Sequence, residues 1–232
     1  MAKEVAESII DRLNLDYIGL APNDVLDIIE DIVSGIVESR ATPPSTESII
    51  KNIMYNKKLF LKAVAARLLE RDTLTLEQLE FIIANAEDLA GRMAPRVYRA
   101  ARNVANSDHI IDALKHLWIQ YGNPTPLECP YCGFRGVTPD LTCVICGSNI
   151  DEEKLKEKIG FTRLLESFAS TADPPMLDEI LRAGYVIIGE DLKPPSMHRR
   201  GEYGVQLYLS RTERDLLRRR LASIFSGRSR LS

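Results

Sequence analysis

Apolar residues recur at helical spacing through the first half of the chain. Val5, Ile9 and Leu13 lie four residues apart, and the same period returns in later segments as far as Trp118. Residues spaced by three or four lie on one face of a helix, which can then pack into a core. The pattern predicts a helical bundle over residues 1–121, built from about six helices.

Local signals predict helix boundaries within this bundle. The two prolines at residues 43–44 interrupt the pattern, because proline cannot continue a helix. Thr75 and Gln78 have the spacing of a capping box, which predicts the start of a helix that ends near Gly91. Asp108 is expected to cap the helix that carries Trp118.

The pattern changes in the last third of the chain, where helical and strand periods alternate. A short β-branched run and a segment of strict alternation predict strands, and paired prolines and a glycine predict helix ends. Thr212 and Asp215 have the spacing of a cap for the last helix. The predicted elements are helices over 161–168, 174–183 and 212–225 and strands over 185–188 and 204–210. The predicted fold class is therefore mainly α with a C-terminal α+β domain over residues 151–232.

The order of helix, turn, helix, strand, basic loop, strand and helix resembles a winged-helix domain. The resemblance implies that the second helix, Met176 to Ala183, enters the major groove and that the loop touches the nucleic-acid backbone. That helix carries Asp178 and Glu179 against Arg182 alone, a poor surface for phosphates. A protein-docking role for this domain therefore stays open.

The four cysteines of the chain form two CxxC pairs separated by ten residues: Cys129, Cys132, Cys143 and Cys146. Two cysteines with this spacing can turn toward one metal ion from a tight knuckle, with sulfur about 2.3 Å from zinc. Gly133 and Gly147 follow the pairs and can take the positive φ that a sharp bend requires. Disulfides are the main alternative, and a redox CxxC pair is disfavoured because the pairs come as a matched set.

Residues 127–149 resemble a short zinc ribbon with CPxCG and CxxCG knuckles. The resemblance implies one structural Zn²⁺ with a closed shell of four thiolates and no position for an activated water. Zinc ribbons bind nucleic acid, dock proteins or only stabilise a fold. The resemblance is therefore specific for metal binding and says little about the function of the segment. A hinge rich in glycine and proline begins at Gly122 and cannot continue a helix. We therefore predict a separate domain over residues 122–150.

Charge is distributed unevenly although the net charge is only −3. Residues 1–50 contain ten acidic and three basic residues, a net charge of −7, whereas residues 193–232 contain three acidic and ten basic residues, a net charge of +7. Such asymmetry predicts a polyanionic partner for the basic end. The alternative is that the two ends face each other or another subunit.

Composition bounds the class of protein. A hydrophobic content of 45% supports an ordinary core. The apolar runs are too short for a membrane helix, and the first residues do not resemble a signal peptide, so a cytoplasmic protein is expected. Twenty arginines against ten lysines are typical of some thermophile families.

Basic side chains in four regions are candidates for contact with DNA or RNA phosphates. They belong to the loop between the strands, the last helix and tail, the cysteine segment and one helix of the bundle. Their members are Lys193, His198, Arg199, Arg200, Arg218, Arg219, Arg220, Arg135, Arg96, Arg99 and Arg102. For the last three, a solvated helix face that pairs with the acidic first fifty residues is the favoured alternative.

We therefore predict a non-enzymatic zinc protein that binds nucleic acid or scaffolds an information-processing complex. Its helical bundle would bind a protein partner or a second copy, and no membrane or small-molecule substrate is expected. One alternative is a protein-protein adaptor without affinity for nucleic acid. Another is a magnesium-dependent nuclease built on Glu190, Asp191 and Lys193, which needs a further acid such as Asp173 or Asp178 on a preceding strand.

Overall fold

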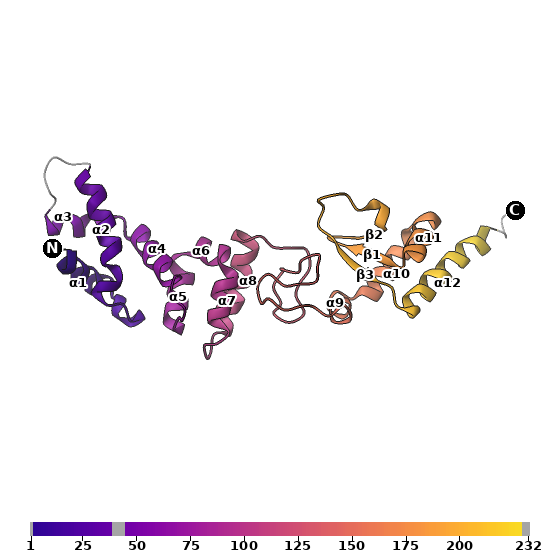
Figure 1. The fold of residues 1–232 in the computed structure, drawn as a ribbon, viewed down its shortest axis with the longest axis horizontal. Coiled ribbons are helices and arrows are strands. Elements are labelled where there is room, and N and C mark those ends of the chain that lie inside the picture. Colours follow the sequence, from indigo (N-terminus) through magenta and orange to yellow (C-terminus); the bar gives the residue numbers. More distant parts are fainter. Residues whose placement is uncertain (1, 39–44, 229–232) are drawn as a thin grey trace. The chain divides into compact units, whose positions relative to one another are not determined.

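A computed structural model describes residues 2–38 and 45–228, which form two compact units. The first unit spans Met1–Gly122 and the second Asn123–Ser232 (Figure 1). The chain is mainly helical, with a small three-stranded antiparallel sheet in the second unit. The predicted break at residues 43–44 lies outside the described residues.

The first unit consists of helices that bury their apolar faces against one another. Helix α1 packs on α2 and α3, α4 packs on α5, and α6 packs on α8. Side chains such as Ile9, Ile29 and Leu79 are completely buried. The helices are α1 (Ala2–Leu13), η1 (Leu15–Ile18), α2 (Pro22–Glu38), α3 (Thr46–Tyr55), α4 (Lys57–Leu68), α5 (Leu76–Asn85), α6 (Glu87–Arg92), α7 (Ala94–Ala101) and α8 (Asp108–Tyr121).

The structure confirms one predicted helix start and corrects two boundaries. Thr75 and Gln78 form the predicted capping box, in which each side chain bonds the backbone of the other residue. The single helix expected to run on to Gly91 instead breaks at Ala86, which leaves the helical conformation at φ −147° and ψ 49°. Asp108 is not the cap of α8, because Ser107 occupies that position. The described part of this unit therefore has eight α-helices rather than about six.

Helices α6 and α8 approach closely at Gly91, the last but one residue of α6. A Cβ atom at this position would lie 2.5 Å from the carbonyl oxygen of Leu117 and 2.8 Å from the Cβ of Tyr121. Both neighbours belong to the body of α8, so neither can rotate away as a flexible side chain would. The absence of a side chain at Gly91 is therefore what allows the two helices to pack at this distance.

The substitution Gly91→Ala is expected to destabilise the first unit by about 1–3 kcal/mol, because α6 and α8 must move apart. Alanine favours a helix over glycine, so a loss of stability would come from packing alone. Denaturant unfolding followed by circular dichroism measures the change. Arg92→Ala, at the exposed neighbouring position, is the matched control. An unchanged unfolding midpoint for Gly91→Ala would contradict the close approach.

The second unit begins with the cysteine module, residues 123–150, and continues into helices around a sheet. The strands run antiparallel in the order β2-β1-β3, with Ile188 opposite both Leu192 and Val205. Helix α11 packs against β1, in which Val186 is completely buried. The elements are α9 (Glu152–Ile159), α10 (Phe161–Thr171), α11 (Pro174–Ala183), β1 (Tyr185–Ile188), β2 (Leu192–Lys193), η2 (Pro195–Met197), β3 (Val205–Tyr208) and α12 (Arg211–Arg228).

Both predicted strands are present, and the structure adds a third. Strand β2 uses two residues of the segment expected to be a loop, and it pairs with the edge of β1 opposite β3. The cap of α12 also differs from the prediction. Ser210 and Glu213 bond each other's backbone N–H, so this pair forms the capping box in place of Thr212 and Asp215.

Candidate metal centre and basic surfaces

The four cysteines lie on two knuckles with the same backbone geometry. In the first, the N–H of Gly133 donates to the carbonyl oxygen of Cys129 over 2.9 Å, and in the second that of Gly147 donates to Cys143 over 2.8 Å. Both glycines have positive φ, 74° and 73°, as the sequence predicted. The repeated CxxCG motif thus folds into a repeated turn that presents two sulfurs on the same side.

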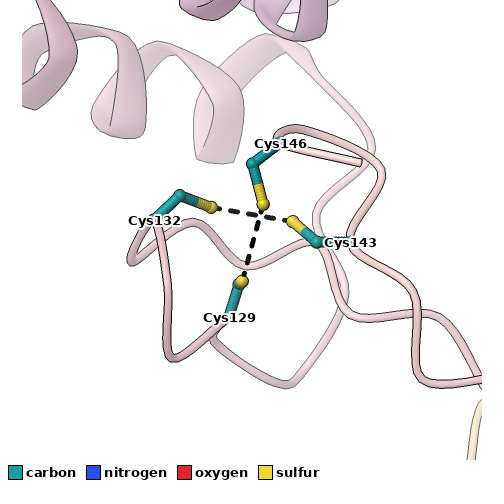
Figure 2. Close-up of side chains that lie close together, drawn as sticks. All are labelled: Cys129, Cys132, Cys143 and Cys146. Carbon is teal, nitrogen blue, oxygen red and sulfur yellow. Dashed lines mark hydrogen bonds between the residues drawn. The ribbon is translucent and has the colours of Figure 1, made fainter. Parts of the chain in front are cut away.

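The four sulfurs converge on one point between the knuckles (Figure 2). All lie within 4.8 Å of one another, with 3.8 Å between the Sγ atoms of Cys129 and Cys146 and 3.6 Å between those of Cys132 and Cys143. Four sulfurs about 2.3 Å from a tetrahedral ion are about 3.8 Å apart. All four cysteines are free, and the sulfurs are too far apart for disulfides. The arrangement fits a metal site.

The protonation of the thiols reflects their crowding. Burial raises the pKa of Cys129 to about 11, and the hydrogen bond with Cys143 raises the pKa of Cys132 above its usual range. The same hydrogen bond lowers the pKa of Cys143 to about 5. Because only thiolates ligate a metal, an ion bound here must displace the protons that the sulfurs share.

The cysteine module contacts the rest of the second unit through polar side chains. Glu128 pairs with Lys158 of α9 over 3.1 Å, and the Tyr203 hydroxyl donates to the carbonyl oxygen of Val137 over 2.6 Å. Burial raises the pKa of Tyr203 to about 12, so this donor stays protonated. The module therefore contacts α9, the helix that follows it, and the loop that precedes β3.

Four of the predicted phosphate-binding side chains have structural partners. The Lys193 ammonium pairs with Glu202, and the Nδ1 atom of His198 lies 3.9 Å from the same carboxylate. Arg135 donates from Nε to the carbonyl oxygen of Thr125 over 3.0 Å. Arg220 donates to the carbonyl oxygens at the end of α10, those of residues 169 and 170, over 3.0 and 2.9 Å.

The other predicted phosphate-binding side chains of the second unit are exposed. Arg199 and Arg200 have no side-chain partner among the described residues. Arg218 pairs with Asp215 over 3.1 Å at the surface, and Arg219 bonds only the backbone of α12. Arg211 was missed by the sequence analysis although it lies seven residues before Arg218 and therefore on nearly the same side of the helix.

The predicted arginines of the bundle, Arg96, Arg99 and Arg102, belong to the first unit and lie along α7 and its end. They line a hollow of about 510 Å³ together with Arg71. None of the three forms an ion pair with an acid of the described part of the chain. The expected pairing with the acidic N-terminal segment is made instead by Arg71, 2.7 Å from Asp24, and by Arg67, 3.7 Å from Asp27.

The residues considered for a nuclease do not assemble as that mechanism requires. Glu190 and Asp191 lie in the turn between β1 and β2, but the Lys193 ammonium is directed at Glu202. Asp173 precedes α11, and Asp178 lies within α11 and pairs with Arg182 over 2.6 Å. Neither lies on a strand that would bring a further acid beside Asp191.

Comparisons of the chain with models of known protein families, with curated proteins and with solved structures found no match. None of the helices in the described segments combines the length and apolar character needed to cross a membrane.

Proposed function

We propose that the protein binds the phosphate backbone of nucleic acid through the second unit and that its four cysteines hold one structural Zn²⁺. The observation that carries the proposal is the set of exposed arginines on α12 and in the loop after η2. We call this set the basic surface, and its members lie in two segments of the unit, Arg199 and Arg200 in the loop and Arg211, Arg218 and Arg219 along α12.

The identity of the metal follows from the chemistry of the ligands. Thiolates are soft ligands that favour zinc over hard cations such as magnesium and calcium. Four thiolates complete a tetrahedral shell, and no position remains for a substrate or an activated water. The ion would therefore stabilise the cysteine module, and recognition would depend on side chains elsewhere in the unit.

The basic surface suits a polyanion because its charges are largely uncompensated. Asp215 is the one acid that pairs with its arginines in the described part of the chain. Each guanidinium can bind two phosphate oxygens at once, and such contacts carry little base specificity. Affinity is expected to be independent of sequence and to fall steeply with salt, because bound counterions are released.

The double substitution Arg218→Gln and Arg219→Gln is expected to weaken binding of single- or double-stranded oligonucleotides by about tenfold or more at low salt. The slope of log affinity against log salt should fall by about two, roughly one for each lost phosphate contact. Fluorescence anisotropy titrations with labelled DNA and RNA at several salt concentrations measure both quantities. Arg182→Gln removes one exposed charge from α11, where Arg182 pairs with Asp178, and serves as the control.

Three outcomes would redirect this assignment. No binding of any oligonucleotide at low salt would favour a protein-protein adaptor. An equal loss of log affinity for each charge removed, in the control and in the double variant, would show that overall charge, rather than the basic surface, determines binding. Cleavage of the oligonucleotides on addition of magnesium, abolished by Asp191→Ala, would favour the nuclease.

A further inference from the structure

The first unit has a second concentration of positive charge, in the hollow beside α7. One wall is the loop between α4 and α5, which contributes Arg71 and Asp72, and the other is the side of α7 with its C-terminal turn. Four arginines and one acid line this hollow of about 510 Å³. A concave surface of this size encloses a small ligand better than a flat helix face does.

Two of the arginines are used to build the hollow. The Arg71 guanidinium binds Asp24 on α2 over 2.7 Å. The backbone carbonyl oxygen of Arg71 accepts a hydrogen bond from the Arg96 guanidinium over 3.4 Å. Arg96 is partly buried and links α7 to the loop. These contacts hold the two walls together and neutralise only one of the four positive charges.

The other two arginines keep their charges available. Arg99 and Arg102 are exposed, three residues apart and so on neighbouring parts of one helical face. Arg99 donates from Nε to the carbonyl oxygen of Pro95, which leaves its terminal nitrogens for a ligand. Within the residues that the structure describes, neither arginine has a carboxylate partner, and Asp72 pairs with none of the four.

We propose that this hollow binds a phosphate group through Arg99 and Arg102, with Arg96 at its wall. Adjacent guanidinium forks match the several oxygens of a phosphate dianion better than the two oxygens of a carboxylate. The phosphate could belong to a small anion or to a nucleic-acid chain, and both present the same chemistry. The site lies on the first unit and does not depend on the basic surface of the second.

Isothermal titration of the full zinc-loaded chain with inorganic phosphate, at constant ionic strength, tests the proposal. The double substitution Arg99→Gln and Arg102→Gln is expected to weaken binding by about tenfold or more, because charge-assisted hydrogen bonds are lost. Arg92→Gln removes an exposed charge from the same unit outside the hollow. The affinity of this variant for phosphate should stay within about twofold of that of the parent protein. Arg102→Lys keeps the charge without the fork and should fall between them.

An eight-nucleotide single-stranded DNA, tested in the Arg218→Gln and Arg219→Gln background, distinguishes the two sources. Tighter binding of inorganic phosphate would identify a free anion, and tighter binding of the oligonucleotide would identify the nucleic-acid backbone. In either case the Arg99 and Arg102 substitutions must weaken the tighter interaction. The proposal is overturned if neither probe binds, if the double variant binds like the parent, or if Arg92→Gln loses as much affinity. Thermal unfolding of each variant verifies that the exposed substitutions leave the fold intact.

Discussion

The substitution Cys143→Ser is expected to abolish metal binding and to unfold the cysteine module, while the first unit remains folded. Cys143 is completely buried, and the module has only a small apolar core around residues such as Phe134 and Val137. A structural zinc site contributes about 10–16 kcal/mol to the folding of a small domain at neutral pH. The first unit has its own apolar core and should therefore keep its helical circular dichroism signal.

Elemental analysis of the purified protein measures the metal, with one zinc per chain expected for the parent and close to none for Cys143→Ser. Limited proteolysis should then cut the variant within residues 123–150. The matched control is Val144→Ser, which introduces serine at the exposed neighbouring position and should retain the metal. A parent protein without metal, or with disulfides detected by mass spectrometry, would refute the zinc site. Iron in place of zinc would refute the identity of the ion alone.

Replacing Lys156 by methionine is expected to destabilise the second unit by about 3–5 kcal/mol, because it leaves the buried Glu213 carboxylate and the partly buried Glu152 carboxylate without a counter-charge. The Lys156 side chain is only 6% exposed and lies 3.3 Å from Glu152 and 3.5 Å from Glu213. Its ammonium also donates to the carbonyl oxygen of Tyr208 over 2.5 Å. One cation thus joins α9, the end of β3 and the start of α12.

Unfolding in denaturant measures the loss, and a double substitution separates charge from packing. Adding Glu213→Gln to Lys156→Met removes an unpaired charge while an amide can still accept the bond from Ser210, so part of the stability should return. Lys154→Met on the exposed side of α9 removes only a cation–π contact with the Tyr131 ring, 5.1 Å away, and should cost no more than about 1 kcal/mol. A Lys156→Met protein as stable as this control would show that the buried charges are solvated or protonated.

The stability of the second unit should also fall at high pH, when Lys156 loses its proton. Burial alone would lower the pKa of Lys156, but the hydrogen bond with Glu153 and the charges of Glu213 and Glu152 outweigh it and raise the pKa above 10.5. When folding raises the pKa of a lysine, the resulting stabilisation is fully present below the pKa of the unfolded state. It is lost as the pH rises through the pKa of the folded state. The parent should therefore lose stability above about pH 10.5 more steeply than Lys156→Met does.

The sequence predicted the kinds of element better than their limits. Helical spacing and alternation are local properties, so the helical first half and the strands at 185–188 and 204–210 were accessible. The break at Ala86 could not be predicted, because α6 changes direction to pack Gly91 against α8. The local sequence pattern carries no information about that neighbour. Strand β2 was missed for the same reason, since two residues form a strand only by pairing with β1.

For the candidate metal site the sequence by itself determined which four cysteines come together, because each knuckle is a local turn and its spacing and glycine specify where two sulfurs point. For the charged residues only the tertiary structure decided which are available to a ligand. Arg220 finds its acceptors on α10, 50 and 51 residues away, and Lys156 finds one on β3, 52 residues away. Sequence records that a residue is charged, but its partners and its burial are set by segments that meet only when the chain has folded.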